Sequence, residues 1–310
     1  MENSGSEKPG NKGSQGFILP GHNQKKFVNI YEDPNFREDL EKNANRFGNA
    51  SCPICRGLGI LFDPLGGGKA RGAFYLCRCL ESQKKTNEPP YEYYSEEKNS
   101  ILPCPTKKAR LAIEKMDRIL LQSGIPEKYK NIFFFSINAG DLLIATAYAG
   151  DVVRDFPEKK TAGLYLHGQT GSGKTMLSTV VLNEIIRLYQ TQVRYAKISR
   201  DIIGKLRASF NTNSEYYGEG RQIEEELAKV PVLVIDDFGV QKESPWVNSV
   251  LYDLIDARYE NELLTILTSN EPLDSLKEIS GGRVYSRLRE MCLEIHIDAP
   301  DYRLSHAKSI

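Results

Sequence analysis

Apolar residues follow two alternating patterns along most of the chain. Short continuous apolar runs are separated by longer segments in which apolar residues recur at helical spacing. Continuous apolar runs are typical of parallel strands buried on both faces, with helices connecting them. The pattern therefore predicts an α/β fold with a five-stranded parallel sheet flanked by helices. The expected strands cover residues 163–167, 193–198, 231–235, 263–270 and 293–297.

The longer segments predict the helices. Residues 107–123 are amphipathic, residues 141–156 precede the first expected strand of the sheet, and residues 176–188 follow it. Ser199 is expected to cap another helix that runs through Phe210.

The first 105 residues differ from the rest in composition. Residues 1–26 are polar and rich in Gly, Ser, Asn and Lys, which predicts a disordered tail. Residues 27–105 are expected to form a small module that ends in a charged linker over residues 81–105. Residues 106–310 then form one larger domain.

Charge and hydropathy exclude some classes of protein. Lys plus Arg and Asp plus Glu number 41 each, so no overall basic field favours nucleic acid, although local basic patches stay possible. The N-terminus lacks the apolar segment of a signal peptide, and no run reaches the roughly 18 apolar residues of a membrane span. We therefore expect a cytoplasmic protein that makes no membrane contact.

Residues 168–175 fit the phosphate-binding P-loop pattern G-x-x-x-x-G-K-[ST]. Its glycines let backbone N–H groups turn toward phosphate, Lys174 supplies positive charge, and Thr175 offers a hydroxyl to Mg²⁺. The expected strand before the loop and helix after it are the context that this motif needs. The candidate nucleotide-binding residues are Gly168, Gln169, Thr170, Gly171, Ser172, Gly173, Lys174 and Thr175.

Two acids end the apolar run at residues 231–235. Asp236 is expected to hold Mg²⁺, and Asp237 to lie near the γ-phosphate and orient or deprotonate water. Many ATPases of this kind carry Glu in place of Asp237. A solvated turn after the strand is the alternative.

The strand at residues 263–270 also ends in a polar residue. Asn270 is expected to polarise the attacking water, because this strand should lie beside the one that carries Asp236. A simple cap before Glu271-Pro272 is the alternative, since Asn-x-Pro is common in turns.

Four of the six cysteines follow the pattern C-x₂-C-x₂₁-C-x-C. Two close pairs separated by a loop suit a tetrahedral Zn²⁺ site, and four thiolates would close the coordination sphere against catalysis. Residues 59–62 and 73–76 are expected to form a hairpin whose tip is Gly66-Gly67-Gly68. Unliganded thiols and a redox site are the alternatives. The candidate zinc ligands are Cys52, Cys55, Cys77 and Cys79.

Basic and aromatic residues gather in two further places. The helix after Ser199 and the loop behind it carry basic residues and tyrosines, which can hold single-stranded nucleic acid by phosphate contact and stacking, or form a solvated face. Arg283 and Arg287 are four residues apart on one helix face. In an oligomer, an exposed arginine there would reach a neighbour's γ-phosphate. In a single chain, a surface basic cluster is the better interpretation.

Together these motifs resemble a known family. The P-loop, Val234-Ile-Asp-Asp-Phe-Gly239, Leu254-Ile-Asp-Ala-Arg-Tyr259, Thr265-Ile-Leu-Thr-Ser-Asn270 and Arg283-Val-Tyr-Ser-Arg-Leu288 look like those of DnaC/DnaI-type replicative helicase loaders, which are AAA+ ATPases. The resemblance covers about residues 125–305. The cysteine module resembles the zinc-bearing N-terminal region of some loaders.

The resemblance implies ATP, Mg²⁺ and Zn²⁺ as cofactors. It implies that Lys174, Thr175, Asp236 and Asp237 bind and hydrolyse ATP and that Asn270 is the sensor. Arg287 would be the finger supplied in trans, with Arg283 nearby, and Arg303 matches a C-terminal Tyr-Arg pair that the family often has. The fold would be an AAA+ core without a C-terminal lid domain, preceded by a zinc ribbon.

The implied function is ATP-dependent loading of the hexameric replicative DNA helicase onto single-stranded DNA, with self-assembly of the loader. The cysteine module is expected to contact the helicase, and residues 200–210 the DNA. One alternative is an IstB-type transposition helper, and another is a nucleotide-gated scaffold with little hydrolysis. Pro commonly precedes the Thr-Ile strand in this family, whereas Leu264 stands there in this chain.

Overall fold

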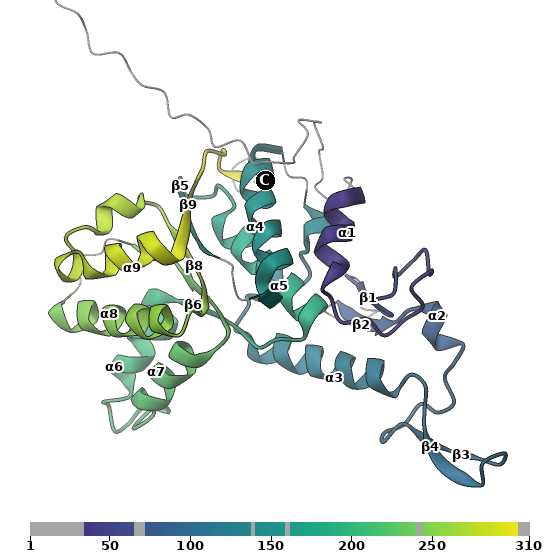
Figure 1. Cartoon of the computed structure of the whole chain (residues 1–310). Coiled ribbons are helices and arrows are strands. Elements are labelled where there is room, and N and C mark those ends of the chain that lie inside the picture. The colour runs from purple at the N-terminus through teal and green to yellow at the C-terminus, as the bar shows by residue number, and fades with distance from the viewer. Residues whose placement is uncertain (1–33, 65–71, 138–139, 159–161, 240–243, 303–310) are drawn as a thin grey trace, which may run out of the picture.

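A five-stranded parallel sheet forms the centre of the computed structural model, which describes residues 34–64, 72–137, 140–158, 162–239 and 244–302 (Figure 1). The strand order is β6-β7-β8-β5-β9, and every neighbouring pair is parallel. The expected α/β fold is confirmed. The sheet strands are β5 (Gly163–Gly168), β6 (Val193–Lys197), β7 (Val232–Asp236), β8 (Leu264–Ser269) and β9 (Cys292–Ile297).

The remaining elements surround this sheet or precede it. They are α1 (Pro34–Lys42), β1 (Ile60–Asp63), β2 (Ala73–Leu76), α2 (Arg78–Glu81), β3 (Glu92–Ser95), β4 (Ser100–Pro103), α3 (Lys107–Gln122), α4 (Leu143–Asp155), α5 (Lys174–Tyr189), the π-helix η7 (Ile198–Gly204), α6 (Lys205–Ala208), α7 (Gly220–Lys229), α8 (Pro245–Glu260) and α9 (Arg283–Met291). Short 3₁₀ turns cover Glu127–Tyr129, Phe134–Ser136, Gly140–Leu142, Phe156–Glu158, Leu273–Leu276 and Ile279–Gly282.

Alternate residues of the buried strands serve two cores. Along β7, Val232 and Val234 pack into one hydrophobic cluster, and Leu233 and Ile235 into the other. The first cluster contains α3, α4 and α5, and the second contains α7, α8 and α9. Because side chains alternate between the two faces of a strand, continuous apolar runs fit a sheet covered on both sides.

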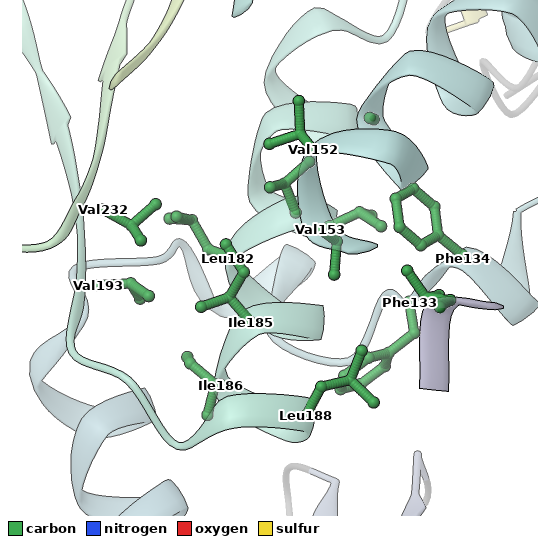
Figure 2. Packing of buried hydrophobic residues seen from close by; sticks show 14 of the residues in the cluster. Phe133, Phe134, Val152, Val153, Leu182, Ile185, Ile186, Leu188, Val193 and Val232 are labelled. Atoms are coloured by element: carbon green, nitrogen blue, oxygen red, sulfur yellow. The ribbon is translucent and has the colours of Figure 1, made fainter. Parts of the chain in front are cut away.

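The N-terminal module packs against the first of these cores. Phe36, Cys55 and Phe74 belong to the same hydrophobic cluster as α4 and α5. Phe133 and Phe134 join this cluster, and Figure 2 shows them beside Val153 and Leu188. The module and the sheet domain therefore share one core.

The predicted hairpin of the module is confirmed. β1 and β2 pair antiparallel, with Ile60 opposite Leu76 and Asp63 opposite Ala73. The expected tip at Gly66–Gly68 lies outside the described residues, as do the tail at residues 1–26 and Arg303.

Two expectations were wrong in part. The segment expected to be a charged linker contains a second hairpin, in which β3 and β4 pair from Glu92–Pro103 to Ser95–Ser100. Asn99 takes a positive φ of 45° in the turn, a conformation that Asn tolerates. After β6 the chain continues as the π-helix η7 from Ile198, so Ser199 lies inside the helix and is not its cap.

Among the described residues, no helix combines the length and the apolar character that a membrane crossing needs.

Candidate nucleotide site and cysteine cluster

The P-loop lies between β5 and α5, as the sequence predicts. β5 ends at Gly168 and α5 begins at Lys174. Gly173 precedes α5 with φ 94°, a conformation that side chains rarely adopt. The Lys174 ammonium donates to the carbonyls of Gly168 at 2.8 Å and Gln169 at 2.7 Å. In this conformation the Lys174 side chain lies across the P-loop. To bind a phosphate, its ammonium would have to leave these two carbonyls.

Asp236 is the buried acid at the end of β7. Its side chain is only 2% exposed, and it accepts hydrogen bonds from Thr175 Oγ1 at 2.8 Å and Thr268 Oγ1 at 2.7 Å. Tyr195 donates to its other oxygen at 2.5 Å. Burial and this carboxylate raise the pKa of Tyr195, so the phenol stays a donor. Thr175 and Asp236 lie together as a pair of oxygen ligands that suits Mg²⁺.

Asp237 differs from its neighbour in exposure and conformation. Its side chain is 65% exposed, and its φ is 65°. The backbone N–H of Asp237 donates to Thr268 Oγ1 at 3.0 Å, so β8 helps to fix this turn. The Asp237 carboxylate lies 4.0 Å from the Lys197 ammonium, which is also 3.6 Å from Asp236.

One cavity of about 650 Å³ gathers these groups. It is lined by P-loop residues from Thr170 onward, although not by Gly168, Gln169 or Ser172, and by both acids, Asn270 and an apolar wall from other segments. Another hollow of about 660 Å³ is lined by residues of α3, β6 and α7 and contains none of the predicted site residues. The first cavity is lined by Tyr129, Asn131, Ile132, Ser136, Ile137, Leu142, Thr170, Gly171, Gly173, Lys174, Thr175, Met176, Lys197, Asp236, Asp237, Thr268, Asn270 and Tyr302.

Sequence reasoning missed much of this lining. Tyr129, Ile132 and Leu142 supply apolar surface from the segment before β5, and Tyr302 lies against the loop with its N–H 3.3 Å from the Gly171 carbonyl. Lys197 could have been suspected, because it is the last residue of a strand that neighbours β7. The residues of the apolar wall carry no such signal in the sequence, because they come from separate segments that only the fold brings together.

The two candidate finger arginines lie outside this cavity. Arg283 and Arg287 begin α9, and their guanidinium carbons lie 4.2 Å and 4.9 Å from the ring centre of Tyr252. Arg287 also pairs with Asp256 and is half-buried, whereas Arg283 is exposed. The shared helix face is confirmed, and a role at a nucleotide would require a second copy of the chain.

The four cysteines converge as expected. Their sulfur atoms all lie within 4.8 Å of one another, with Cys52–Cys77 at 3.7 Å and Cys55–Cys79 at 3.5 Å. Sulfurs placed tetrahedrally around Zn²⁺ would be about 3.8 Å apart. Gly59 permits the turn after the first pair, because a Cβ there would lie 2.6 Å from the backbone nitrogen of Gly48.

The thiols of this cluster have divergent acidities without a cation. Backbone N–H groups of Cys55 and Ile54 lower the pKa of Cys52 to about 7, whereas burial raises the pKa of Cys55 to about 12. A bound cation would favour the thiolate form of every ligand. The donor set and its spacing therefore fit Zn²⁺.

The basic and aromatic residues after Ser199 form a surface patch. The patch also includes Trp246 of α8, which was not predicted from the sequence. Phe210 is 74% exposed and meets Trp246 of α8 edge-on at 6.2 Å, and Arg207 lies 6.0 Å from the Trp246 ring. Lys205 lies over Tyr216 at 5.1 Å. Trp246 was missed because it lies 36 residues beyond Phe210 in the sequence.

A P-loop joined to an α/β sheet, with a buried acid beside the loop, defines the class of nucleotide-binding α/β proteins. Residues 153–309 match the model of the IstB-like ATP binding protein family. Since this match covers half of the chain, the chain belongs to that family.

Several helicase loaders are similar to the chain. "Replicative helicase loader DnaC" of Escherichia coli K12 is 26% identical over 177 residues, which cover 56% of this chain and 70% of that protein. "Replicative helicase loader DnaI" of Bacillus subtilis is 24% identical over 220 residues, 64% of this chain and 67% of that protein. A putative primosome component from Streptococcus pyogenes superposes with a TM-score of 0.49 at 25% identity, covering 60% of this chain and 97% of that one.

Proposed function

We propose that this protein is an ATP-dependent loader that delivers the hexameric replicative DNA helicase to single-stranded DNA. The similarity to DnaC and DnaI carries the proposal. The cavity that gathers Lys174, Asp236 and Asn270 supports its ATP-dependent part. A loader of this kind acts in the cytoplasm.

The proposed chemistry is hydrolysis of ATP to ADP and phosphate. Phosphates would lie along the P-loop N–H groups, and the Lys174 ammonium would exchange its loop carbonyls for phosphate oxygens. Thr175 and Asp236 would hold Mg²⁺, which neutralises phosphate charge when bound. Asp237 would accept the proton of the attacking water, and Asn270 would orient that water.

Self-assembly would complete the site. In the proposed assembly, Arg283 and Arg287 of one copy face the nucleotide of the next. In the single chain Arg287 is held by Asp256 and Arg283 lies over the Tyr252 ring, so assembly would have to release either arginine from these contacts. Arginines supplied this way stabilise charge in the transition state.

The surface patch of Arg207, Phe210 and Trp246 is the proposed contact with single-stranded DNA. Its exposed ring can stack on a base, and its cation can meet phosphate. Figure 1 shows α6 and α8 on the opposite side of the sheet from the β3–β4 hairpin.

The N-terminal module is the proposed contact with the helicase, and its zinc site would keep the module folded. In the β3–β4 hairpin, the cross-strand partners Tyr94 and Ile101 are 58% and 69% exposed. An exposed apolar pair on a projecting hairpin is a surface that a protein partner can cover.

The decisive experiment is to mix the full chain with the replicative helicase and Mg-ATP and to measure the mass of the complex. Two double variants control each other. Tyr94→Ser with Ile101→Ser should lose the helicase and keep single-stranded DNA binding, and Arg207→Ala with Phe210→Ala should do the reverse. Absence of any complex, with ATP bound and the protein folded, would overturn the loader proposal.

A transposition helper is the second candidate, because the matching family model is IstB-like. Duplex DNA binding beside a transposase, without a helicase complex, would favour it. A nucleotide-gated scaffold is the third, because Asp237 stands where many ATPases have Glu. Single-turnover hydrolysis with and without single-stranded DNA separates this candidate from the other two.

A further inference from the structure

The segment from Tyr129 to Ile137 forms one wall of the nucleotide cavity. Five of its residues line the cavity: Tyr129, Asn131, Ile132, Ser136 and Ile137. The wall lies between the P-loop helix α5 on one side and the β1–β2 hairpin of the cysteine module on the other.

Buried polar groups of α5 hold the inner side of this wall. Asn183 Nδ2 donates to the carbonyls of Tyr129 at 2.8 Å and Ile132 at 2.7 Å. The Glu184 carboxylate accepts the N–H of Phe134 at 3.0 Å. Asn183 is 1% exposed and Glu184 is fully buried. Because α5 begins at Lys174, these bonds fix the wall relative to the P-loop.

The cysteine module holds the outer side. Asn131 Oδ1 accepts the N–H of Gly72 at 3.1 Å, and Asn131 Nδ2 donates to the carbonyl of Pro64 at 3.2 Å. One side chain thus bonds to the chain just after β1 and just before β2. The ring of Phe62 also packs 4.5 Å from that of Phe133, centre to centre.

The hairpin depends in turn on the cysteine cluster. β2 ends at Leu76, and the next residue, Cys77, donates its N–H to the Gly59 carbonyl at 2.8 Å. A two-stranded hairpin is at most marginally stable alone. Closing four thiolates around a metal would supply the missing stability.

We infer that the cysteine module helps to shape the nucleotide site. Its hairpin holds Asn131 and Phe133, and these positioning residues set the wall against which the nucleotide binds. Metal loading of the module and nucleotide affinity are then linked, and linkage is reciprocal. The inference rests on the nucleotide and zinc parts of the proposed function and is independent of helicase loading.

The first test uses the metal-loaded full chain and fluorescent N-methylanthraniloyl-ADP. Phe62→Ala removes the ring contact from the module side without touching the cavity, and Asn131→Ala removes both hydrogen bonds. Each should weaken ADP binding at least about 5-fold, the lower range of measured couplings. Tyr75→Ala is the matched control, because Tyr75 lies on the same hairpin and is 46% exposed. Its affinity should equal that of the wild type.

Circular dichroism and zinc content must be unchanged in all three variants. If Phe62→Ala and Asn131→Ala then bind ADP as tightly as the wild type, the inference is wrong. A loss with Asn131→Ala alone also overturns it, because Asn131 would then act by touching the nucleotide directly.

The second test measures the linkage. Saturating ADP should slow the transfer of Zn²⁺ from the wild-type protein to a chromophoric chelator, and Asn131→Ala should abolish most of that protection. Equal transfer rates with and without bound ADP would overturn the inference. A protein that binds no Zn²⁺ would overturn it as well. Failure to bind the helicase, with linkage present, would count only against the loader proposal.

Discussion

At the scale of single residues, the buried carboxylate of Asp236 is the most demanding group of the site. Three hydroxyl groups donate to it, and the Lys197 ammonium lies 3.6 Å away. A buried charge is costly unless it is paired and hydrogen-bonded. These partners therefore offset the cost of burying the Asp236 carboxylate at the proposed metal position.

Asp236→Asn keeps the shape of this side chain and removes its charge. The proposed hydrolysis of Mg-ATP should fall at least about 100-fold, because loss of the charge proposed to hold the metal would weaken stabilisation of the transition state. ADP binding without Mg²⁺ should stay close to that of the wild type, since the P-loop is intact. Phosphate release and ADP titration measure the two effects. The control is Asp253→Asn on α8, where normal hydrolysis is expected.

Lys197 is the cation shared by both acids. Lys197→Met should lower kcat of the proposed hydrolysis by about 10-fold or more, because Asp237 would lose the charge that positions it. KM should change less, since P-loop contacts carry most of the binding. Lys197→Arg should restore part of kcat. If both variants raised KM and left kcat intact, Lys197 would bind substrate and have no positioning role.

At the scale of elements, the strands were the easiest part to predict from the sequence. The run at residues 231–235 became β7, whose five residues are all buried, and the loop between β5 and α5 needed only its glycines and lysine to be recognised. The local sequence pattern is enough to predict an element when all the residues that identify it lie in one segment.

Two kinds of feature were not predicted: a hairpin without a strong local signal, and contacts between residues that lie far apart in the sequence. The β3–β4 hairpin lies in a charged stretch, and its turn at Asn99 is not a strong local signal. Asn131 meets Pro64 and Gly72 across some 60 residues of chain, a distance no local pattern bridges. The polar residues at the strand ends of the site were therefore predicted from the sequence, and the apolar wall of the cavity was not.

Arg258 connects α8 with α7 and β8. The sequence motif that contains it gave no indication of this role. It is fully buried and donates to the carbonyls of Leu227, Val230 and Leu264 at 2.7–2.8 Å and to Thr265 Oγ1 at 2.9 Å. Two of these carbonyls end α7, where a cation is favourable. Burial lowers the pKa of Arg258 to about 9, so these bonds must offset a desolvation cost.

Arg258→Met keeps the aliphatic length and leaves the four acceptors without their donor. The free energy of unfolding should fall by about 3 kcal/mol, because unsatisfied buried acceptors cost more than the relieved desolvation returns. Urea unfolding followed by circular dichroism measures this change. Unchanged or higher stability would mean that desolvation of the guanidinium outweighs its hydrogen bonds.

At the scale of the whole molecule, the module and the sheet domain are joined along α4 and α5. Phe36 of α1 lies so close to Gly150 of α4 that a Cβ there would be 2.1 Å from its ring. The N–H of Asn45 donates to the Leu188 carbonyl at 2.9 Å, at the far end of α5 from the P-loop. Deleting residues 1–105 would therefore expose apolar surface of the sheet domain, and point substitutions are the better probe of partner binding.

Such a shared core predicts that the metal-loaded chain unfolds as one cooperative unit. The chain has one tryptophan, Trp246, which reports on α8 across the sheet from the module. Release of Zn²⁺ to a chromophoric chelator reports on the cysteine cluster. In urea, both signals should change at the same midpoint, because opening the module would expose the core of α4 and α5.

Gly150→Val sharpens this test, since its side chain would displace Phe36 and loosen the contact between α1 and α4. In this variant, Zn²⁺ release should move to lower urea than the Trp246 transition. If the wild-type protein already released Zn²⁺ well before Trp246 responded, the module would be an independently unfolding unit. The Phe62 and Asn131 contacts would then be too weak to couple metal and nucleotide. The two proposals for the module, helicase contact and coupling to the nucleotide site, would have to be tested separately.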